Sequence, residues 1–296
     1  MGKNSKKRRD QKKKKATLKH HQAPKVLRNL HINRKKYIKE WGITSTFFQD
    51  EEYYQWMASK VTGFHYILEV GCGVGWSTLA LLQAGHKVVS IDENPVCLSE
   101  TRKLLEEQGF SVVCVERGEI SPKGENNYSI KYKNIKTQGD PDALLIEGDA
   151  LGDNGLKRWL ESIERFDAVI CWLLGTHNSR GNNTSIDLNI VSNASTHRLF
   201  VQNKVYELAD RILKKDGILN VIDRTQYPDT QELVDDFKRS HKEQASVTSL
   251  DVFEIDFQEY KEPNKEGATK MMLTIPEQNK GFNLSKMALT SITSKK

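Results

Sequence analysis

Short apolar runs alternate with amphipathic stretches through the middle of the chain. "YILEV" at 66–70 and "KVVSID" at 87–92 have the length and apolar character of buried strands. "WSTLALLQAG" at 76–85 has helical spacing, and so does "NPVCLSETRKLLEEQG" at 94–109, with a proline near its start and a glycine at its end. The same alternation continues with predicted strands at 143–151, 166–175 and 218–223 and predicted helices at 155–166 and 203–217.

This alternation predicts an α/β fold. Strands separated by helices form βαβ units, so we expect a mostly parallel sheet covered by helices on both faces, a three-layer sandwich. A turn rich in Pro, Gly and Asn lies between two β-rich runs and predicts an inserted β-hairpin at about 111–135. Near the C-terminus, 246–260 and 269–276 are predicted to form two antiparallel strands that complete the sheet.

Charge is distributed unevenly and defines a separate N-terminal segment. Residues 1–39 contain 16 Lys and Arg against one acid, whereas the rest of the chain contains 29 against 38, so the two parts carry +15 and −9. We expect a disordered basic arm at 1–39, because so charged a segment buries too little apolar surface to offset its ordering entropy. The arm is either a solvated tail, a contact for RNA or a ribosome, or, in a eukaryotic source, a nuclear localisation signal.

An aromatic-rich stretch follows the arm. It is predicted to form a helical N-terminal cap at 40–65, whose aromatic side chains either pack on the core or cover a ligand. The main domain is expected at 66–276, and 277–296 is expected to be a C-terminal tail because it is polar and weakly patterned. The four cysteines form no CxxC pair, so we expect reduced thiols, no metal site and a cytoplasmic protein. No membrane partner is expected, because the chain has no apolar stretch of about 18 residues.

Three glycines follow the first predicted strand in "LEVGCGVG". In a turn between a strand and a helix, glycines let the backbone approach a ligand closely, and the helix N-terminus offers free N–H groups. Gly71, Gly73 and Gly75 have the spacing GxGxG, whereas a dinucleotide-binding turn has GxGxxG and would place glycine where this chain has Trp76. The spacing therefore indicates a nucleotide-type cofactor other than NAD or FAD.

"LEVGCGVG" resembles motif I of the class I S-adenosylmethionine-dependent methyltransferases. The resemblance covers roughly residues 66–223 and implies a Rossmann-like methyltransferase fold with a seven-stranded sheet and S-adenosylmethionine as the cofactor. It implies that Asp92 accepts both ribose hydroxyls, that Asp149 accepts from the adenine amine and that the Ala150 N–H donates to an adenine nitrogen. Glu69 is expected either to brace the glycine loop or to face the cationic methionine end of the cofactor.

The strand "FDAVICWLLG" resembles motif IV, whose end meets the transferred methyl group. The family's base methyltransferases have an Asn/Asp-Pro-Pro-Tyr/Phe run or a Pro-Cys pair there, and this chain has neither. His177, just beyond the strand, is the candidate general base, and an ordinary loop histidine that contacts backbone or solvent is the alternative. Cys171 is expected to be a core residue, and the polar loop 176–189 is expected to contribute to acceptor recognition. Within that loop, Arg180 either pairs with an anionic acceptor or is solvated.

We therefore expect an S-adenosylmethionine-dependent methyltransferase. A small molecule or a protein is favoured as the methyl acceptor, because the base-methylation motifs are absent and the body of the chain is acidic. RNA or a ribonucleoprotein is the alternative, with the basic arm binding phosphates. A non-catalytic methyltransferase-like binding protein is a further alternative.

Overall fold

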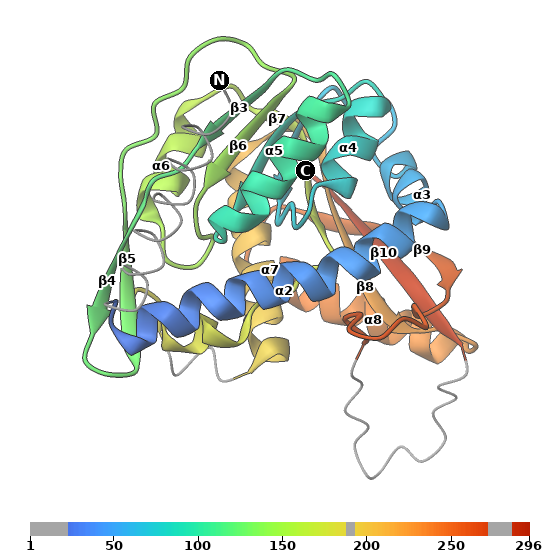
Figure 1. Cartoon of the computed structure of the whole chain (residues 1–296). Coiled ribbons are helices and arrows are strands. Elements are labelled where there is room, and N and C mark those ends of the chain that lie inside the picture. Colours follow the sequence, from blue (N-terminus) through green and yellow to red (C-terminus); the bar gives the residue numbers. More distant parts are fainter. Residues whose placement is uncertain (1–22, 188–192, 272–285) are drawn as a thin grey trace, which may run out of the picture.

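An eight-stranded sheet forms the centre of the molecule (Figure 1). The computed structural model describes residues 23–187, 193–271 and 286–296. The strand order is β3-β6-β2-β1-β7-β8-β10-β9, in which the first six strands are parallel and β10 and β9 are antiparallel. The strands are β1 (Tyr66–Val70), β2 (Lys87–Asp92), β3 (Val112–Val115), β6 (Ala143–Glu147), β7 (Phe166–Trp172), β8 (Leu213–Gln226), β9 (Asp251–Tyr260) and β10 (Met287–Lys295).

Helices cover both faces of this sheet, so the predicted three-layer Rossmann-like sandwich is confirmed. Alternate strand residues enter two separate cores: Ile67 of β1 packs with α3, α4 and α5, and Leu68 packs with α6, α7 and α8. The helices are α2 (Lys25–Asp50), α3 (Tyr53–Ser59), α4 (Trp76–Gln83), α5 (Pro95–Glu107), α6 (Asn154–Ser162), α7 (Ala194–Ile212) and α8 (Gln231–Ala245), with a short 3₁₀ helix η1 (Asn178–Asn182).

The predicted hairpin at 111–135 is wrong in its first strand. Val112–Val115 forms β3, a parallel edge strand beside β6, and this is why the sheet has eight strands and not seven. The hairpin itself consists of β4 (Gly118–Lys123) and β5 (Asn127–Tyr132), which form a separate two-stranded sheet. A short apolar run has the same period in a parallel edge strand and in a hairpin, so periodicity could not separate the two.

The predicted C-terminal tail at 277–296 is also wrong in its described part. β10 lies between β8 and β9 and pairs with both. Its sequence looks weakly patterned because its buried positions include hydroxyl residues that have partners inside the sheet: Thr293 accepts from the Asn220 amide at 3.0 Å. The predicted strand at 269–276 lies outside the described residues beyond 271, and 269–271 form no strand.

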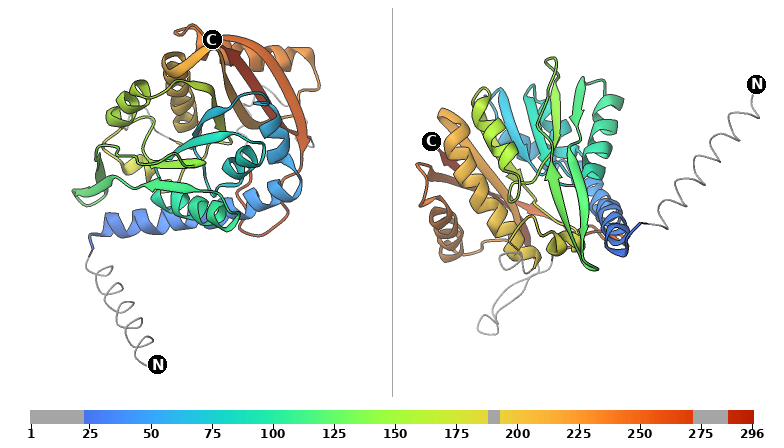
Figure 2. Two further views of the ribbon diagram at one scale, coloured as in Figure 1. Left: turned by 90° about the horizontal axis from the view of Figure 1, so that it is seen from above. Right: turned by 90° about the vertical axis from the view of Figure 1, so that its left-hand side faces the viewer.

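The N-terminal arm is shorter than predicted, because α2 begins at Lys25. Val26 and Leu30, four residues apart, are buried against Tyr128 and Ile130 of β5, and this contact stabilises a helix that the charge of the segment seemed to exclude. Residues 1–22 of the predicted arm lie outside the described residues. Figures 1 and 2 show α2 running from the hairpin across the molecule toward α3.

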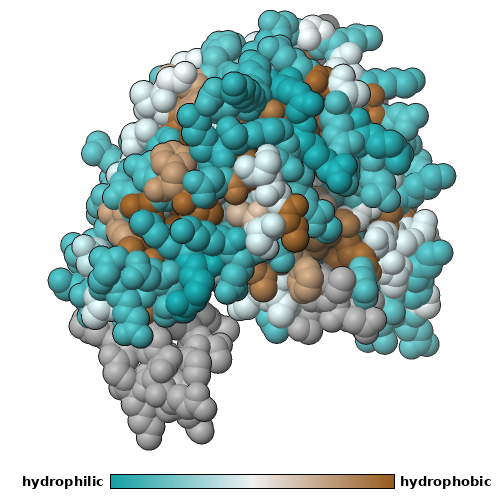
Figure 3. Space-filling view, turned by 180° about the vertical axis from the view of Figure 1, so that it is seen from behind, coloured by the Kyte–Doolittle hydropathy of each residue, from teal (hydrophilic) through white to brown (hydrophobic). Residues whose placement is uncertain are grey.

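The surface is mainly hydrophilic on the face shown in Figure 3, where apolar groups form small patches. The large exposed apolar side chains in the described ranges are scattered over different elements, namely Ile32, Leu199, Val247 and Phe253. Of the helices that the structure describes, none has both the length and the apolar composition required to cross a bilayer.

Candidate cofactor pocket and active site

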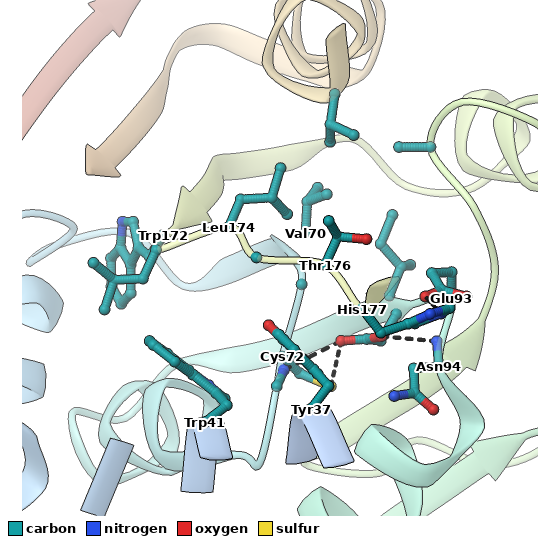
Figure 4. Close-up of a pocket in the computed structure, with 18 of the residues that line it drawn as sticks. Tyr37, Trp41, Val70, Cys72, Glu93, Asn94, Trp172, Leu174, Thr176 and His177 are labelled. Atoms are coloured by element: carbon teal, nitrogen blue, oxygen red, sulfur yellow. Dashed lines mark hydrogen bonds and ion pairs between the residues drawn. The ribbon is translucent and has the colours of Figure 1, made fainter. Parts of the chain in front are cut away.

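One pocket lies at the carboxyl ends of the parallel strands (Figure 4). Its floor is formed by the loops that follow β1, β2, β6 and β7, where ligands of open α/β sheets bind. Helix α2 covers it, and Tyr37 and Trp41 extend from this helix toward the end of β7, which carries Trp172.

The glycine loop after β1 has the bare backbone that the sequence predicted. Gly71 and Gly73 line the pocket, and Gly73 has φ +55°. A Cβ atom at Gly73 would lie 2.6 Å from Nε1 of Trp41, so this position has no room for a side chain. Gly75, in contrast, does not line the pocket: it precedes α4 with φ +94° and packs against Thr101 of α5. Gly75 therefore allows the backbone to turn from the loop into α4.

Glu69 braces this loop, which is one of the two roles expected for it. Its buried carboxylate accepts hydrogen bonds from Ser77 and Thr78 at the start of α4 and from Ser90 on β2, each at 2.5 Å. Burial raises the pKa of Glu69, and the three hydroxyl donors oppose that rise. Both carboxylate oxygens are therefore engaged in joining β1, α4 and β2.

Asp92 ends β2 and lines the pocket, as the sequence predicted. Its Oδ2 accepts from the Gly73 N–H at 3.2 Å, and its Oδ1 accepts from the Asn94 N–H at 2.8 Å. Burial, followed by the adjacent Glu93 charge, raises the pKa of Asp92 to about 7. The Asp92 carboxylate thus fixes the glycine loop, and its oxygens can still accept hydrogen bonds from the two hydroxyls of a ribose.

Asp149 and Ala150 line the same pocket from the loop after β6. Oδ1 of Asp149 accepts from the Leu151 N–H at 2.9 Å, whereas Oδ2 is buried and has no hydrogen-bond partner among the described residues. A buried acceptor without a partner is costly, and the amine of an adenine ring would satisfy it. The residues therefore fit the adenosine part of the expected cofactor.

Arg180 is buried at the pocket and not solvated, which excludes one of the two expectations for it. Its Nη2 lies 2.5 Å from Oδ1 of Asp149, and both side chains are buried. Its Nε donates to Nε2 of His197 at 3.2 Å. Burial, followed by the charge of Arg180, lowers the pKa of His197 to about 4, so this ring is neutral and accepts the bond. Arg180 thus fixes one oxygen of Asp149 and leaves the other to a ligand.

His177 lines the pocket but contacts Glu93, the residue after Asp92. Its Nε2 lies 2.9 Å from Oε1 of Glu93, and its Nδ1 is buried with no hydrogen-bond partner in the described ranges (Figure 4). A carboxylate that orients one ring nitrogen and leaves the other available is the arrangement of many general bases. Cys171 is fully buried inside β7, as predicted.

The aromatic cap both packs on the core and lines the pocket, so the two roles considered for it coexist. Phe48, Tyr53 and Met57 are buried in the core, Trp41 lines the pocket, and Tyr54 does both. Tyr37, just before the predicted cap, also lines the pocket. Burial raises the pKa of Tyr37 well above its usual value, and the phenol is therefore a donor and not a base.

Sequence reasoning missed two pocket residues, Tyr37 and Glu93, and also Arg34, which binds Glu93. Glu93 follows Asp92 directly, and the pattern offered no reason to separate the two carboxylates. Tyr37 and Arg34 fell inside the segment predicted to be disordered. Their spacing from Val26, Leu30 and Trp41 is helical, and this was the signal that could have found them.

A family model for a methyltransferase domain matches residues 67–127, from β1 to the start of β5. This is the part that contains the glycine loop, Glu69 and Asp92, and the rest of the pocket completes the same cofactor site. The chain thus contains a methyltransferase domain, and its pocket fits S-adenosylmethionine as the cofactor. None of the curated proteins compared with this methyltransferase is similar enough to count as a relative.

Solved structures similar to this methyltransferase share little sequence with it. Precorrin-6y C5,15-methyltransferase from Geobacter metallireducens is 12% identical, with 84% of this chain and 88% of that chain covered and a TM-score of 0.40. SMU.1697c from Streptococcus mutans, in complex with SAH, is 14% identical, with 82% and 97% covered and a TM-score of 0.39. A methyltransferase from Methanosarcina mazei is 12% identical, with 78% and 92% covered and a TM-score of 0.40. These solved structures are too distant to support the methyltransferase assignment, which rests on the matched domain and on the geometry of the pocket.

Proposed function

We propose that this methyltransferase acts on a small molecule or on a protein side chain. The observation that supports this most is the covered, aromatic pocket: α2 lies over the strand ends, and Tyr37, Trp41 and Trp172 line the space beneath it. A covered pocket admits a small molecule or one extended side chain more readily than a folded polymer. The absence of both base-methylation motifs after β7 agrees with this choice.

The residues of the pocket have distinct tasks in this reaction. The bound cofactor supplies a methyl group already activated by its sulfonium sulfur, so the protein mainly aligns the acceptor in line with it. Asp92 binds the ribose hydroxyls, Oδ2 of Asp149 accepts from the adenine amine, and the Ala150 N–H donates to the ring. Glu69 keeps the glycine loop in the shape that gives the cofactor room.

His177 is our candidate for removing a proton from the acceptor. Nε2 faces Glu93 at 2.9 Å, which orients the ring and leaves the buried Nδ1 without a partner in the described part of the chain. For a hydroxyl acceptor, this nitrogen would take the proton as the oxygen attacks the methyl group; for a protonated amine, it would take the proton before the attack and so free the lone pair.

The acceptor class can be identified by labelled methyl transfer. The purified enzyme with radiolabelled S-adenosylmethionine is incubated with cell extract, and the label is followed in the small-molecule, protein and RNA fractions. We expect label among small molecules or proteins, with the same yield after ribonuclease treatment. Label confined to RNA, or abolished by ribonuclease, would contradict the proposed acceptor class.

A second candidate, methylation of RNA or of a ribonucleoprotein, is favoured by the outer face of α2. Lys25, Lys35 and Lys39 are exposed there at helical spacing, directly after the basic residues 1–22. Each lysine bound to a duplex phosphate contributes about 0.9 to the salt slope of log K. The full chain with all three lysines changed to Gln should therefore lose RNA affinity and up to about three units of slope, whereas a matched change at exposed Lys215, Lys242 and Lys261 should not. Equal RNA binding by both variants removes this candidate.

The cytoplasm is the compartment we propose, because the four cysteines are free thiols. In a eukaryotic source the lysine clusters would add nuclear import. Fluorescence of a tagged full-length chain, with and without the lysines at 12–15, distinguishes the two locations.

A further inference from the structure

Arg34 is the one buried cation of α2. The other Lys and Arg residues described between 25 and 39 are exposed or half-buried, whereas Arg34 is 3% exposed. Its Nη2 donates to the backbone oxygen of Glu93 and to Oε2 of the same residue, both at 2.9 Å. Arg34 on α2 therefore binds Glu93, the residue that follows Asp92.

Glu93 is held as a carboxylate by Arg34 on α2 and Arg180 on η1, and Nε2 of His177 lies 2.9 Å from it. Burial raises the pKa of Glu93, but His177, Arg34 on α2 and Arg180 on η1 together hold it well below its usual value. Other titratable groups that interact with it are Tyr37 on α2, Cys97 on α5, His197 on α7, and Tyr128 and Tyr132 on β5. Burial raises the pKa values of the tyrosines and the thiol and lowers the pKa of His197. A permanent negative charge thus lies next to Asp92.

This charge acts on Asp92, which is already poorly solvated. Burial and then Glu93 raise the pKa of Asp92 to about 7, while Arg34 lowers it. The remaining titratable neighbours keep their protons, because burial also raises the pKa values of the Tyr37 phenol and of the Cys72 and Cys97 thiols. Arg34 is therefore a cation on α2 that offsets the charge beside the ribose acceptor.

We propose that Arg34 is a positioning residue for the cofactor: by neutralising Glu93 and holding its backbone, it keeps the Asp92 carboxylate ionised and in place for the ribose diol. The inference rests on the assignment of this pocket to S-adenosylmethionine. It also gives α2 a function beyond covering the pocket, since docking of the helix and formation of the cofactor site occur together. If Arg34 only attached α2 to Glu93, it would stabilise the fold and would not change how the affinity for the cofactor depends on pH.

The test is the affinity for S-adenosylhomocysteine, measured by calorimetry between pH 6 and 9 for the full chain and its variants. The wild type should bind less tightly as the pH falls through about 7, because a protonated Asp92 accepts poorly. In Arg34→Gln this weakening should begin about one pH unit higher and reduce affinity about fivefold at pH 7, with most of the affinity regained at pH 9. Titration of the ligand's own amine is common to all variants and cancels in the comparison.

Three further variants complete the design. Arg34→Lys keeps the charge and should restore much of the affinity at pH 7. Arg34→Gln combined with Glu93→Gln removes both charges, so the pH at which the affinity falls should return to the wild-type value or below. Lys35→Gln, an exposed neighbour, is the control and should match the wild type.

An Arg34→Gln variant that binds like the wild type, or that is weakened equally at every pH, overturns the proposal. If Arg34→Gln does not fold, as thermal unfolding would show, the double variant decides: a wild-type pH profile supports the proposal, and persistent loss of binding overturns it. A wild type that does not bind the ligand would refute the cofactor assignment and not the role of Arg34.

Discussion

At the scale of single residues, the pocket is organised around carboxylates that differ in their surroundings. Glu69 accepts hydrogen bonds from three hydroxyl groups. Glu93 lies beside Arg34 and His177, and one carboxylate oxygen of Asp149 is paired with Arg180. Asp92 receives two backbone N–H groups and no cation directly. The sequence predicted Asp92 and Asp149 through their places at strand ends. It could not predict that Glu93 and Arg34 would be paired, since their partnership depends on how α2 docks.

Asp92 should make the stability of the ligand-free protein depend on pH. Its pKa in the folded protein is raised from 3.8 to about 7, so its contribution to stability is present below about pH 4 and is lost as the pH rises through about 7. Asp92→Asn cannot titrate, and it should therefore gain stability relative to the wild type between pH 5 and 8. Denaturant unfolding at several pH values measures this difference. A difference that stays constant across the range would mean that Asp92 titrates normally.

His177→Ala should separate catalysis from binding. If Nδ1 takes a proton from the acceptor, the substitution should lower turnover by about a hundredfold, which is within the range known for general bases. Affinity for S-adenosylhomocysteine, measured at pH 9 where Asp92 is ionised, should stay within a few-fold of the wild type, because the expected adenosine contacts come from other residues. Methyl incorporation by the labelled-extract assay and calorimetry measure the two quantities. Full turnover in the variant would show that His177 is only a loop residue.

At the scale of elements, apolar patterning predicted the regular part of the sheet and missed the parts that depend on distant partners. β1, β2 and β7 are buried on both faces, and their apolar runs were recognisable without any other information. β10 was missed because the partners of its buried hydroxyls lie on β8 and α7, far away in the sequence. α2 was missed because a segment with many lysines can still form a helix when a few residues on one side have a surface to pack on.

The docking of α2 on the hairpin can be tested by truncating one side chain. Leu30 is 2% exposed and packs with Tyr128 and Ile130 of β5, so Leu30→Ala should destabilise the protein by about 2–4 kcal/mol. Ile32, on the same helix, is 55% exposed, and Ile32→Ala should change the free energy of unfolding by less than about 0.5 kcal/mol. Denaturant unfolding of both variants checks this. Equal stabilities would mean that the first half of α2 does not dock.

At the scale of the whole molecule, the sheet gathers residues from four strand ends into one pocket, and α2 joins the basic N-terminal segment to it. The inner side of α2 contributes Arg34, Tyr37 and Trp41 to the site, while its outer side carries exposed lysines. The same helix therefore faces the cofactor pocket on one side and exposes lysines on the other, which is the surface that our second candidate function assigns to RNA.

The central claim is that this pocket binds S-adenosylmethionine through the glycine loop, and titration calorimetry with S-adenosylhomocysteine tests it most directly. Gly73→Ala places a methyl group 2.6 Å from Trp41 in the pocket, whereas Gly63→Ala, also at positive φ, meets no atom within 4 Å and controls for backbone strain. We predict that the wild type and Gly63→Ala bind the ligand and that Gly73→Ala binds at least tenfold more weakly. A wild type that does not bind, or a Gly73→Ala variant that binds as tightly as Gly63→Ala, would contradict the claim.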